Sequence, residues 1–185
     1  MKNPYTLVSS KTVYSNPPWM QVREDHVLNV KGEDQIFGVT TIYSGVSVLA
    51  LDDQLNTYLV NEFHYALDAE SLEAVSGGRH EHDESFLDCA KRELREETGI
   101  VAEHWVKLGV IQPLTTIFSC PQHLFLARKL QFTQINPDKT EDIALIKLPL
   151  ADAVEKVFKS EIVHAPSAVL ILKADAYLKK PWKTV

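Results

Sequence analysis

Residues 77–100 read GGRHEHDESFLDCAKRELREETGI, and the interpretation of the whole chain starts from this stretch. A polar segment with two glycines leads into the clearest helical pattern of the sequence. We expect the helix to begin near Glu84 or Ser85, with the Asp83 carboxylate as its N-cap. Gly99 suits the left-handed position that follows a helix, and so predicts its end.

The predicted helix has an apolar stripe and a charged side. Phe86, Leu87, Ala90 and Leu94 recur at helical spacing and should face the core, whereas Asp88, Lys91, Arg92 and Arg95 should face solvent.

Glu93, Glu96 and Glu97 lie on the edge where the apolar stripe begins. Like charges at i,i+3 and i,i+4 repel one another, and the C-terminal end of a helix disfavours anions. One interpretation is a solvated helix face bridged by Arg92 and Glu96. Crowding of the three carboxylates beside the apolar stripe favours a second interpretation, in which they are metal ligands. Carboxylate oxygens are the ligands that hard divalent cations such as Mg²⁺ prefer.

Composition and charge narrow the class of protein. The chain has 185 residues, 45% hydrophobic and 24% charged, as an ordinary globular protein has. Its formal net charge of −6 gives no general attraction for polyanions, so nucleic acid is not an expected partner. Two cysteines without disulfide spacing, and neither a signal peptide nor a membrane-spanning run, lead us to expect a cytoplasmic protein without a membrane partner.

Outside this stretch the pattern predicts strands mixed with two further helices, and hence an α/β (α+β) sandwich. A domain boundary is expected near residue 43, which separates an N-terminal β-strand unit (1–43) from the main domain (44–185). The expected strands are 19–25, 26–32, 34–43, 45–51, 57–63, 106–114, 122–130 and 142–150, and the further helices are 151–159 and one opened by Pro166.

The stretch resembles the signature of the Nudix hydrolases: a glycine, five residues, Glu, seven residues, then Arg-Glu-apolar-x-Glu-Glu-x-Gly-apolar. Every specified position is filled, by Gly78, Glu84, Arg92, Glu93, Leu94, Glu96, Glu97, Gly99 and Ile100.

This resemblance implies an αβα sandwich with a mixed sheet and a site that binds Mg²⁺ or Mn²⁺. On that model Glu93, Glu96, Glu97 and the carbonyl of Gly77 are metal ligands. Arg92 holds the carboxylates, and we count Arg92 and Glu96 among the catalytic residues. Gly78, Glu84 and Gly99 would be structural parts of the motif.

Most of residues 12–175 also resemble one branch of this family, the ADP-ribose and nucleotide-sugar pyrophosphatases. This resemblance implies a homodimer built through the N-terminal strands. His64 stands where the branch has a diphosphate-binding arginine, and Glu73 is displaced by one position from the branch's glutamate. A histidine can donate to phosphate but lacks the fixed charge of arginine, and a histidine at a strand end is often simply structural. Glu141, in the loop 136–142, is the candidate general base or late metal ligand, with solvation as the alternative.

Two more candidates have alternatives of their own. Arg79 could meet phosphate or be merely exposed, and Trp19 could stack on a base or pack within a dimer. Cys89 is expected to be a small buried residue rather than a nucleophile.

The function predicted is water attack on phosphorus in a nucleoside diphosphate linked to a further group, ADP-ribose or another nucleotide sugar. Two alternatives stay open: a nucleotide-binding regulatory module without turnover, and a hydrolase of non-nucleotide diphosphates.

Overall fold

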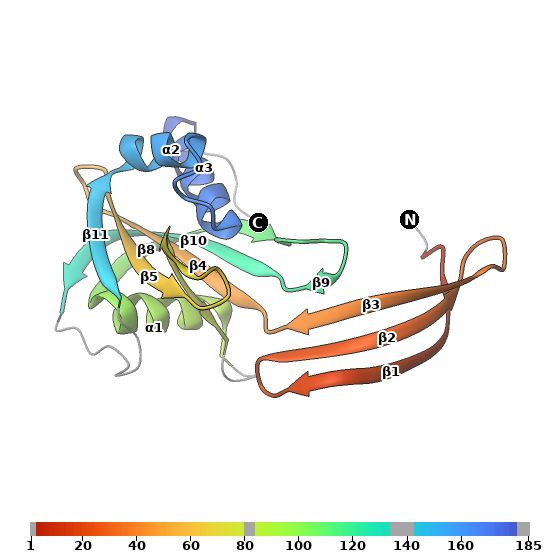
Figure 1. The fold of residues 1–185 in the computed structure, drawn as a ribbon. Coiled ribbons are helices and arrows are strands. Elements are labelled where there is room, and N and C mark those ends of the chain that lie inside the picture. Colours follow the sequence, from red (N-terminus) through yellow and green to blue (C-terminus); the bar gives the residue numbers. More distant parts are fainter. Residues whose placement is uncertain (1–2, 80–83, 134–142, 181–185) are drawn as a thin grey trace. The chain divides into compact units, whose positions relative to one another are not determined.

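The computed structural model describes residues 3–79, 84–133 and 143–180 and divides into two compact units. The first comprises residues 1–44 together with 112–121, and the second comprises 45–111 and 122–185. Each unit has its own sheet (Figure 1). Within the described ranges no helix is long and apolar enough to cross a membrane.

The N-terminal unit is a four-stranded sheet in the order β1-β2-β3-β9. Neighbours are antiparallel except β3 and β9, which are parallel. At the turn between β2 and β3 the Asn29 side-chain oxygen accepts hydrogen bonds from the backbone N–H groups of Lys31 and Glu33. The strands are β1 (Thr6–Asn16), β2 (Met20–Leu28), β3 (Asp34–Ile42) and β9 (Phe118–Ser119).

Two sequence predictions for this unit were wrong. The ranges 19–25 and 26–32 were expected to be separate strands, but β2 runs through both of them to Leu28. Strand β1 was not expected at all, because its apolar residues Leu7, Val8, Val13 and Tyr14 come as adjacent pairs and do not alternate with polar residues as they would on a half-buried strand.

The second unit is a mixed seven-stranded sheet in the order β11-β5-β4-β10-β8, with β6 paired to β5 and β7 paired to β4. Strands β4 and β10 are parallel, and the other pairs are antiparallel. The strands are β4 (Gly45–Leu51), β5 (Asn56–His64), β6 (Ala69–Glu73), β7 (Val75–Gly78), β8 (Ile100–Ile111), β10 (Gln122–Phe132) and β11 (Ala144–Pro149).

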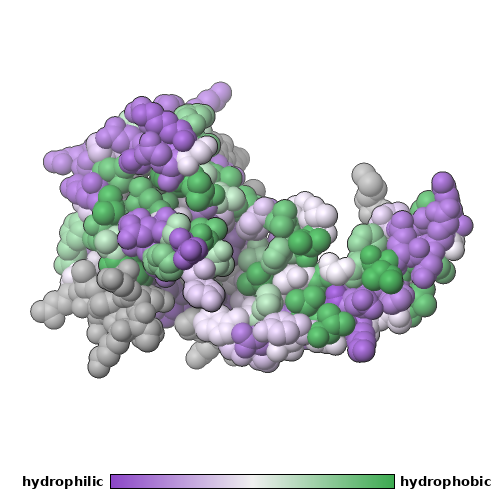
Figure 2. Space-filling view, viewed as in Figure 1, coloured by the Kyte–Doolittle hydropathy of each residue, from purple (hydrophilic) through white to green (hydrophobic). Residues whose placement is uncertain are grey.

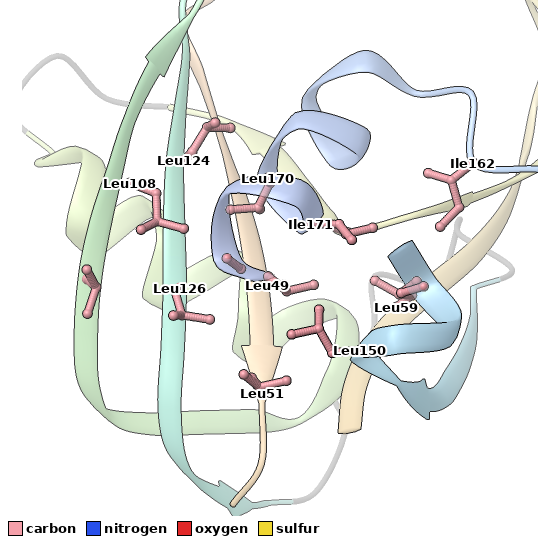
Figure 3. Close-up of a cluster of buried hydrophobic side chains, with 14 of the residues drawn as sticks. Leu49, Leu51, Leu59, Leu108, Leu124, Leu126, Leu150, Ile162, Leu170 and Ile171 are labelled. Atoms are coloured by element: carbon pink, nitrogen blue, oxygen red, sulfur yellow. The ribbon is translucent and has the colours of Figure 1, made fainter. Parts of the chain in front are cut away.

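Helices cover both faces of this sheet (Figure 1). Helix α1 (Phe86–Thr98) packs on one face, and α2 (Leu150–Phe158) and α3 (Ala165–Lys179) pack on the other. Alternate residues of β4 point to the two faces, as in any strand. Val48 belongs to the core under α1, and Leu49 to the core under α3, which Figure 3 shows around Leu170 and Ile171.

The fully buried β4 follows from this double cover, because a strand with helices on both faces has no solvent side. The expected αβα sandwich with a mixed sheet is confirmed, and so is the expected pairing of 45–51 with 57–63 through a short polar connection. The strands β6 and β7 are short, and sequence patterning did not indicate them.

Candidate active site

Helix α1 begins and ends at residues suited to those positions. Ser85 is the N-cap, and its hydroxyl accepts a hydrogen bond from the backbone N–H of Asp88. The expectation that Asp83, which lies outside the described residues, caps the helix was therefore wrong. Gly99 adopts the left-handed conformation, with φ of 68°, and its N–H donates to the Arg95 carbonyl, so the predicted helix end is confirmed.

Gly77 on β7 brings the backbone against the edge of α1. An added Cβ at Gly77 would lie 2.0 Å from the carboxyl carbon of Glu93, which is closer than any packed contact allows. Glu93 itself is buried, with 8% of its surface exposed. A glycine at residue 77 therefore lets the Glu93 carboxylate lie directly on the strand backbone.

Arg92 links the helix edge to the loop before it. Its guanidinium contacts Glu84 at 3.0 Å, Glu93 at 2.8 Å and Glu96 at 3.0 Å. It also donates a hydrogen bond of 3.1 Å to the carbonyl of Gly78. Burial alone would lower the pKa of Arg92, but these carboxylate partners raise it above its usual range, so the guanidinium stays charged.

The predicted solvent-side position of Arg92 was wrong. Only 21% of its side chain is exposed, whereas Lys91 and Arg95 are exposed as expected. Helical periodicity places the Cα, and a long side chain can turn from there toward partners on the neighbouring face. The carboxylates of Glu84, Glu93 and Glu96 attract the guanidinium of Arg92 away from solvent.

The donor set fits a hard divalent cation in its chemistry. Glu93, Glu96 and Glu97 supply carboxylate oxygens from one helix edge, and the Glu93 carboxylate lies in the space left by the missing Gly77 side chain. In the part of the chain that the structure describes, no three His, Cys, Asp or Glu side chains converge as a formed metal site. In this structure the guanidinium of Arg92 is the cation between Glu93 and Glu96.

His64 and Glu73 are brought together by the antiparallel pairing of β5 and β6. Nε2 of His64 lies 2.9 Å from Oε1 of Glu73 but is not aligned for a hydrogen bond. On the other side of the carboxylate, Nδ1 of His164 lies 2.8 Å from Oε2. The hydroxyl of Ser167 lies 2.8 Å from the same ring nitrogen and accepts a hydrogen bond from the N–H of Ala74.

This network ties α3 to the strand connection that leads to Gly77. Burial alone would raise the pKa of Glu73, but the hydrogen bond and positive charge of His164 outweigh it and lower the pKa. Sequence reasoning missed His164 and Ser167. The only signal was their place at the start of the helix opened by Pro166, because a contact between residues this far apart needs the folded chain.

Arg79 lies beside the start of α1, with its guanidinium 4.8 Å from the centre of the Phe86 ring. The Phe86 ring is also stacked on the ring of His123, with the two ring centroids 3.5 Å apart. Arg79 also donates a hydrogen bond of 3.5 Å to the carbonyl of Glu84. Arg79 therefore lies close to the Arg92 network.

The other predicted residues lie elsewhere. Trp19 belongs to the N-terminal unit and is 60% exposed. Glu141 lies outside the described residues. Cys89 is fully buried, and burial together with Glu84 and Glu93 raises the pKa of its thiol to about 12, so it cannot supply a thiolate nucleophile at neutral pH.

A family comparison places this geometry in a known class. The NUDIX domain model matches residues 42–167, which is more than half of the chain. The chain therefore belongs to the Nudix family and is a Nudix hydrolase. Residues 5–40 match a second model, described as the nucleoside diphosphate sugar hydrolase N-terminal domain.

Individual relatives agree with that class. The chain is 29% identical over 128 residues to an ADP-ribose pyrophosphatase of Bacillus subtilis, covering 68% of this chain and 69% of the relative. It is 24% identical over 175 residues to an ADP-ribose pyrophosphatase of Mycobacterium tuberculosis, covering 93% and 84%. It is 27% identical over 130 residues to the ADP compounds hydrolase NudE of Escherichia coli, covering 70% and 68%.

A solved structure confirms the fold. The crystal structure of an ADP compounds hydrolase superposes with a TM-score of 0.82 at 19% identity, covering 95% of this chain and 94% of that one.

Proposed function

We propose that this Nudix hydrolase is a divalent-metal-dependent pyrophosphohydrolase that cleaves a nucleoside diphosphate linked to a second group, with ADP-ribose or another nucleotide sugar as its substrate. The observation that carries the proposal is the Glu93 carboxylate, held on the Gly77 backbone and bridged by Arg92 to Glu96 and Glu84. The names of the three relatives support the same substrate class.

Each residue of the site has a part in this proposal. Glu93, Glu96, Glu97 and the Gly77 carbonyl would hold Mg²⁺ or Mn²⁺. When bound, such an ion neutralises diphosphate oxygens and lowers the pKa of a water for attack on phosphorus. Arg92 keeps Glu93 and Glu96 in place, and Glu84 keeps Arg92 in place.

Substrate contacts belong to the proposal as well. Arg79, close to this network, would meet a phosphate, and His64 would donate to the diphosphate in place of an arginine. Base stacking by Trp19 and proton removal by Glu141 stay predictions, as does a cytoplasmic location.

Turnover tests the proposal directly. The purified protein with Mg²⁺ or Mn²⁺ should convert ADP-ribose to adenosine monophosphate and ribose 5-phosphate, as separated products show. Addition of a chelator should stop the reaction. Nucleotide binding without cleavage across a panel of nucleotide sugars would instead identify a regulatory module, and cleavage of non-nucleotide diphosphates alone would identify the third class.

The variant Glu97→Gln tests the metal assignment. It removes one anionic oxygen donor while keeping the shape of the side chain, so turnover should fall by about 100-fold or more while nucleotide binding stays measurable. Glu103→Gln, the same change at an exposed position on β8, is the matched control and should keep full activity. Unchanged turnover in Glu97→Gln would contradict the assignment of this residue.

A further inference from the structure

The outer side of α1 and the first residues of β8 form a pocket. It is an open pocket of about 320 Å³. Lys91, Arg92 and Arg95 line it from the helix, and Trp105 lines it from the strand. Among the described residues that line it, Asp88 is the one acidic residue.

The basic residues that line the pocket from the helix outnumber its acidic lining residue, Asp88. Lys91 and Arg95 are four residues apart on the same helix, a spacing at which like charges repel. Asp88 lies 3.4 Å from Lys91. Within residues 3–79, 84–133 and 143–180 no hydrogen bond or ion pair engages the guanidinium of Arg95, so the pocket offers a cation for an anionic ligand.

The opposite wall is apolar. Trp105 is half-buried, and its indole N–H already donates a hydrogen bond of 3.0 Å to the carbonyl of Ala102. The accessible surface of the indole ring therefore has no unsatisfied hydrogen-bond donor. Val101 and Ala102 continue this wall. An aromatic ring can pack here while a charged group attached to it reaches Lys91 and Arg95.

The size selects among ligands of this kind. Sites for small molecules measure about 300–1,000 Å³, and this pocket lies at the lower end. One base, one sugar and one phosphate suit that volume better than a diphosphate carrying two sugars.

We propose that this pocket binds a nucleoside monophosphate, with its phosphate at Lys91 and Arg95 and its base against Trp105. A nucleoside monophosphate is a product of the reaction proposed above. The inference that its binding regulates hydrolysis therefore rests on that proposed function, whereas the inference that the pocket binds it does not.

Arg92 connects the pocket to the site of hydrolysis. Arg92 is one of the residues that line the pocket, and its guanidinium contacts Glu93 at 2.8 Å and Glu96 at 3.0 Å. A phosphate in the pocket competes with these carboxylates for Arg92 and weakens their positioning. Occupancy should therefore slow hydrolysis without blocking substrate binding.

Calorimetric titration of the full chain in a chelator tests binding apart from turnover. Adenosine monophosphate should bind, whereas adenosine and ribose 5-phosphate should each bind at least about tenfold more weakly, because each lacks one half of the contacts. Arg95→Gln should weaken binding of the monophosphate about tenfold, the loss of one charged hydrogen bond. Lys31→Gln, which removes an exposed cation in the N-terminal unit, should leave binding unchanged.

Three results would overturn the binding site: no binding of adenosine monophosphate, equal affinity in Arg95→Gln and the original chain, or equal affinity for ribose 5-phosphate. Circular dichroism of Arg95→Gln checks that the variant is folded, and Lys91→Gln provides a second, independent removal of charge from the same pocket.

Steady-state kinetics test the regulatory part. Added adenosine monophosphate should lower kcat with little change in KM, and Arg95→Gln should relieve this inhibition while keeping its kcat in the absence of the monophosphate. Purely competitive inhibition, equal in both proteins, would refute regulation through this pocket. Absence of any hydrolysis would refute the proposed function and leave the binding titration to decide the pocket.

Discussion

Gly77 and Gly78 are neighbours in the sequence, but the structure places different demands on them. A Cβ at Gly77 would collide with the Glu93 carboxyl, whereas a Cβ at Gly78 would meet nothing within 4 Å. Gly78 contributes through its carbonyl, which accepts hydrogen bonds from Arg92 and Cys89. The close approach of strand and helix is therefore a property of residue 77.

Substitution at these two positions separates the effects. Gly77→Ala should cost about 1–3 kcal/mol of unfolding free energy and most of the activity, because Glu93 must move. Gly78→Ala is the matched control and should change the unfolding free energy by less than about 1 kcal/mol. Urea denaturation and turnover assays measure both quantities, and similar losses in the two variants would contradict the packing argument.

Residue patterning could identify most of the site but not the direction of each side chain. The spacing of Arg92 and the glutamates indicated a shared helix edge, yet helical periodicity assigned Arg92 to solvent. Its partners Glu84 and Gly78 lie on the preceding loop and strand. Their positions relative to α1 depend on packing, which periodicity does not describe.

At the scale of elements, α3 is joined to the strand β6 by polar contacts as well as by the core. The Glu73 carboxylate lies 2.8 Å from Nδ1 of His164, and the Ser167 hydroxyl accepts a hydrogen bond from the backbone N–H of Ala74. Both Glu73 and Ser167 are buried, so each of these groups needs its partner.

Removal of the imidazole tests this junction. His164→Ala should lower the unfolding free energy by about 1.5–3 kcal/mol at pH 7, because it leaves a buried carboxylate short of a hydrogen-bond partner. His104→Ala, an exposed histidine on β8, is the control and should have a small effect.

The loss should also depend on pH. The pKa of Glu73 is lower in the folded chain than its ordinary value of 4.5. A carboxyl group of this kind contributes its stability above the unfolded pKa and loses it as the pH falls through the folded pKa. The difference between the original chain and His164→Ala should therefore shrink as the pH falls below about 4.5, as denaturation curves at several pH values would show. A difference that grew toward low pH would be inconsistent with the Glu73 contact.

Strand β1 shows what patterning cannot detect among elements. Helix α1 was predicted within two residues because one face is buried and both ends have suitable caps. Strand β1 has no buried face, and its apolar residues do not alternate with polar ones, so the pattern of a half-buried strand is absent from its sequence. Its pairing with β2 is seen only in the folded chain.

At the scale of the whole molecule, we propose a homodimer assembled through the N-terminal unit. Strand β1 is an edge strand of eleven residues. Figure 2 shows apolar surface on this sheet, and the exposed apolar residues of β1 are Leu7, Val8, Val13 and Tyr14. An exposed edge with apolar side chains invites pairing unless a partner covers it.

Light scattering coupled to size exclusion measures the assembly. The full chain should elute with twice the mass of one 20.9 kDa chain. The double change Leu7→Lys and Val13→Lys should shift the protein toward monomer. Val30→Lys, at an exposed position in the turn between β2 and β3, is the control and should stay dimeric. A monomeric original chain at micromolar concentration would refute the proposal.

The sequence by itself determined the family, the approximate extent of α1, its C-terminal end at Gly99, and the glutamates that share its edge, because these depend on spacing along one helix and on local capping. Only the tertiary structure decided that Gly77 lies on Glu93, that Arg92 turns inward, and that His164 reaches Glu73. Each of those contacts joins elements separated along the chain, and their meeting depends on how the sheet and helices pack rather than on local propensity.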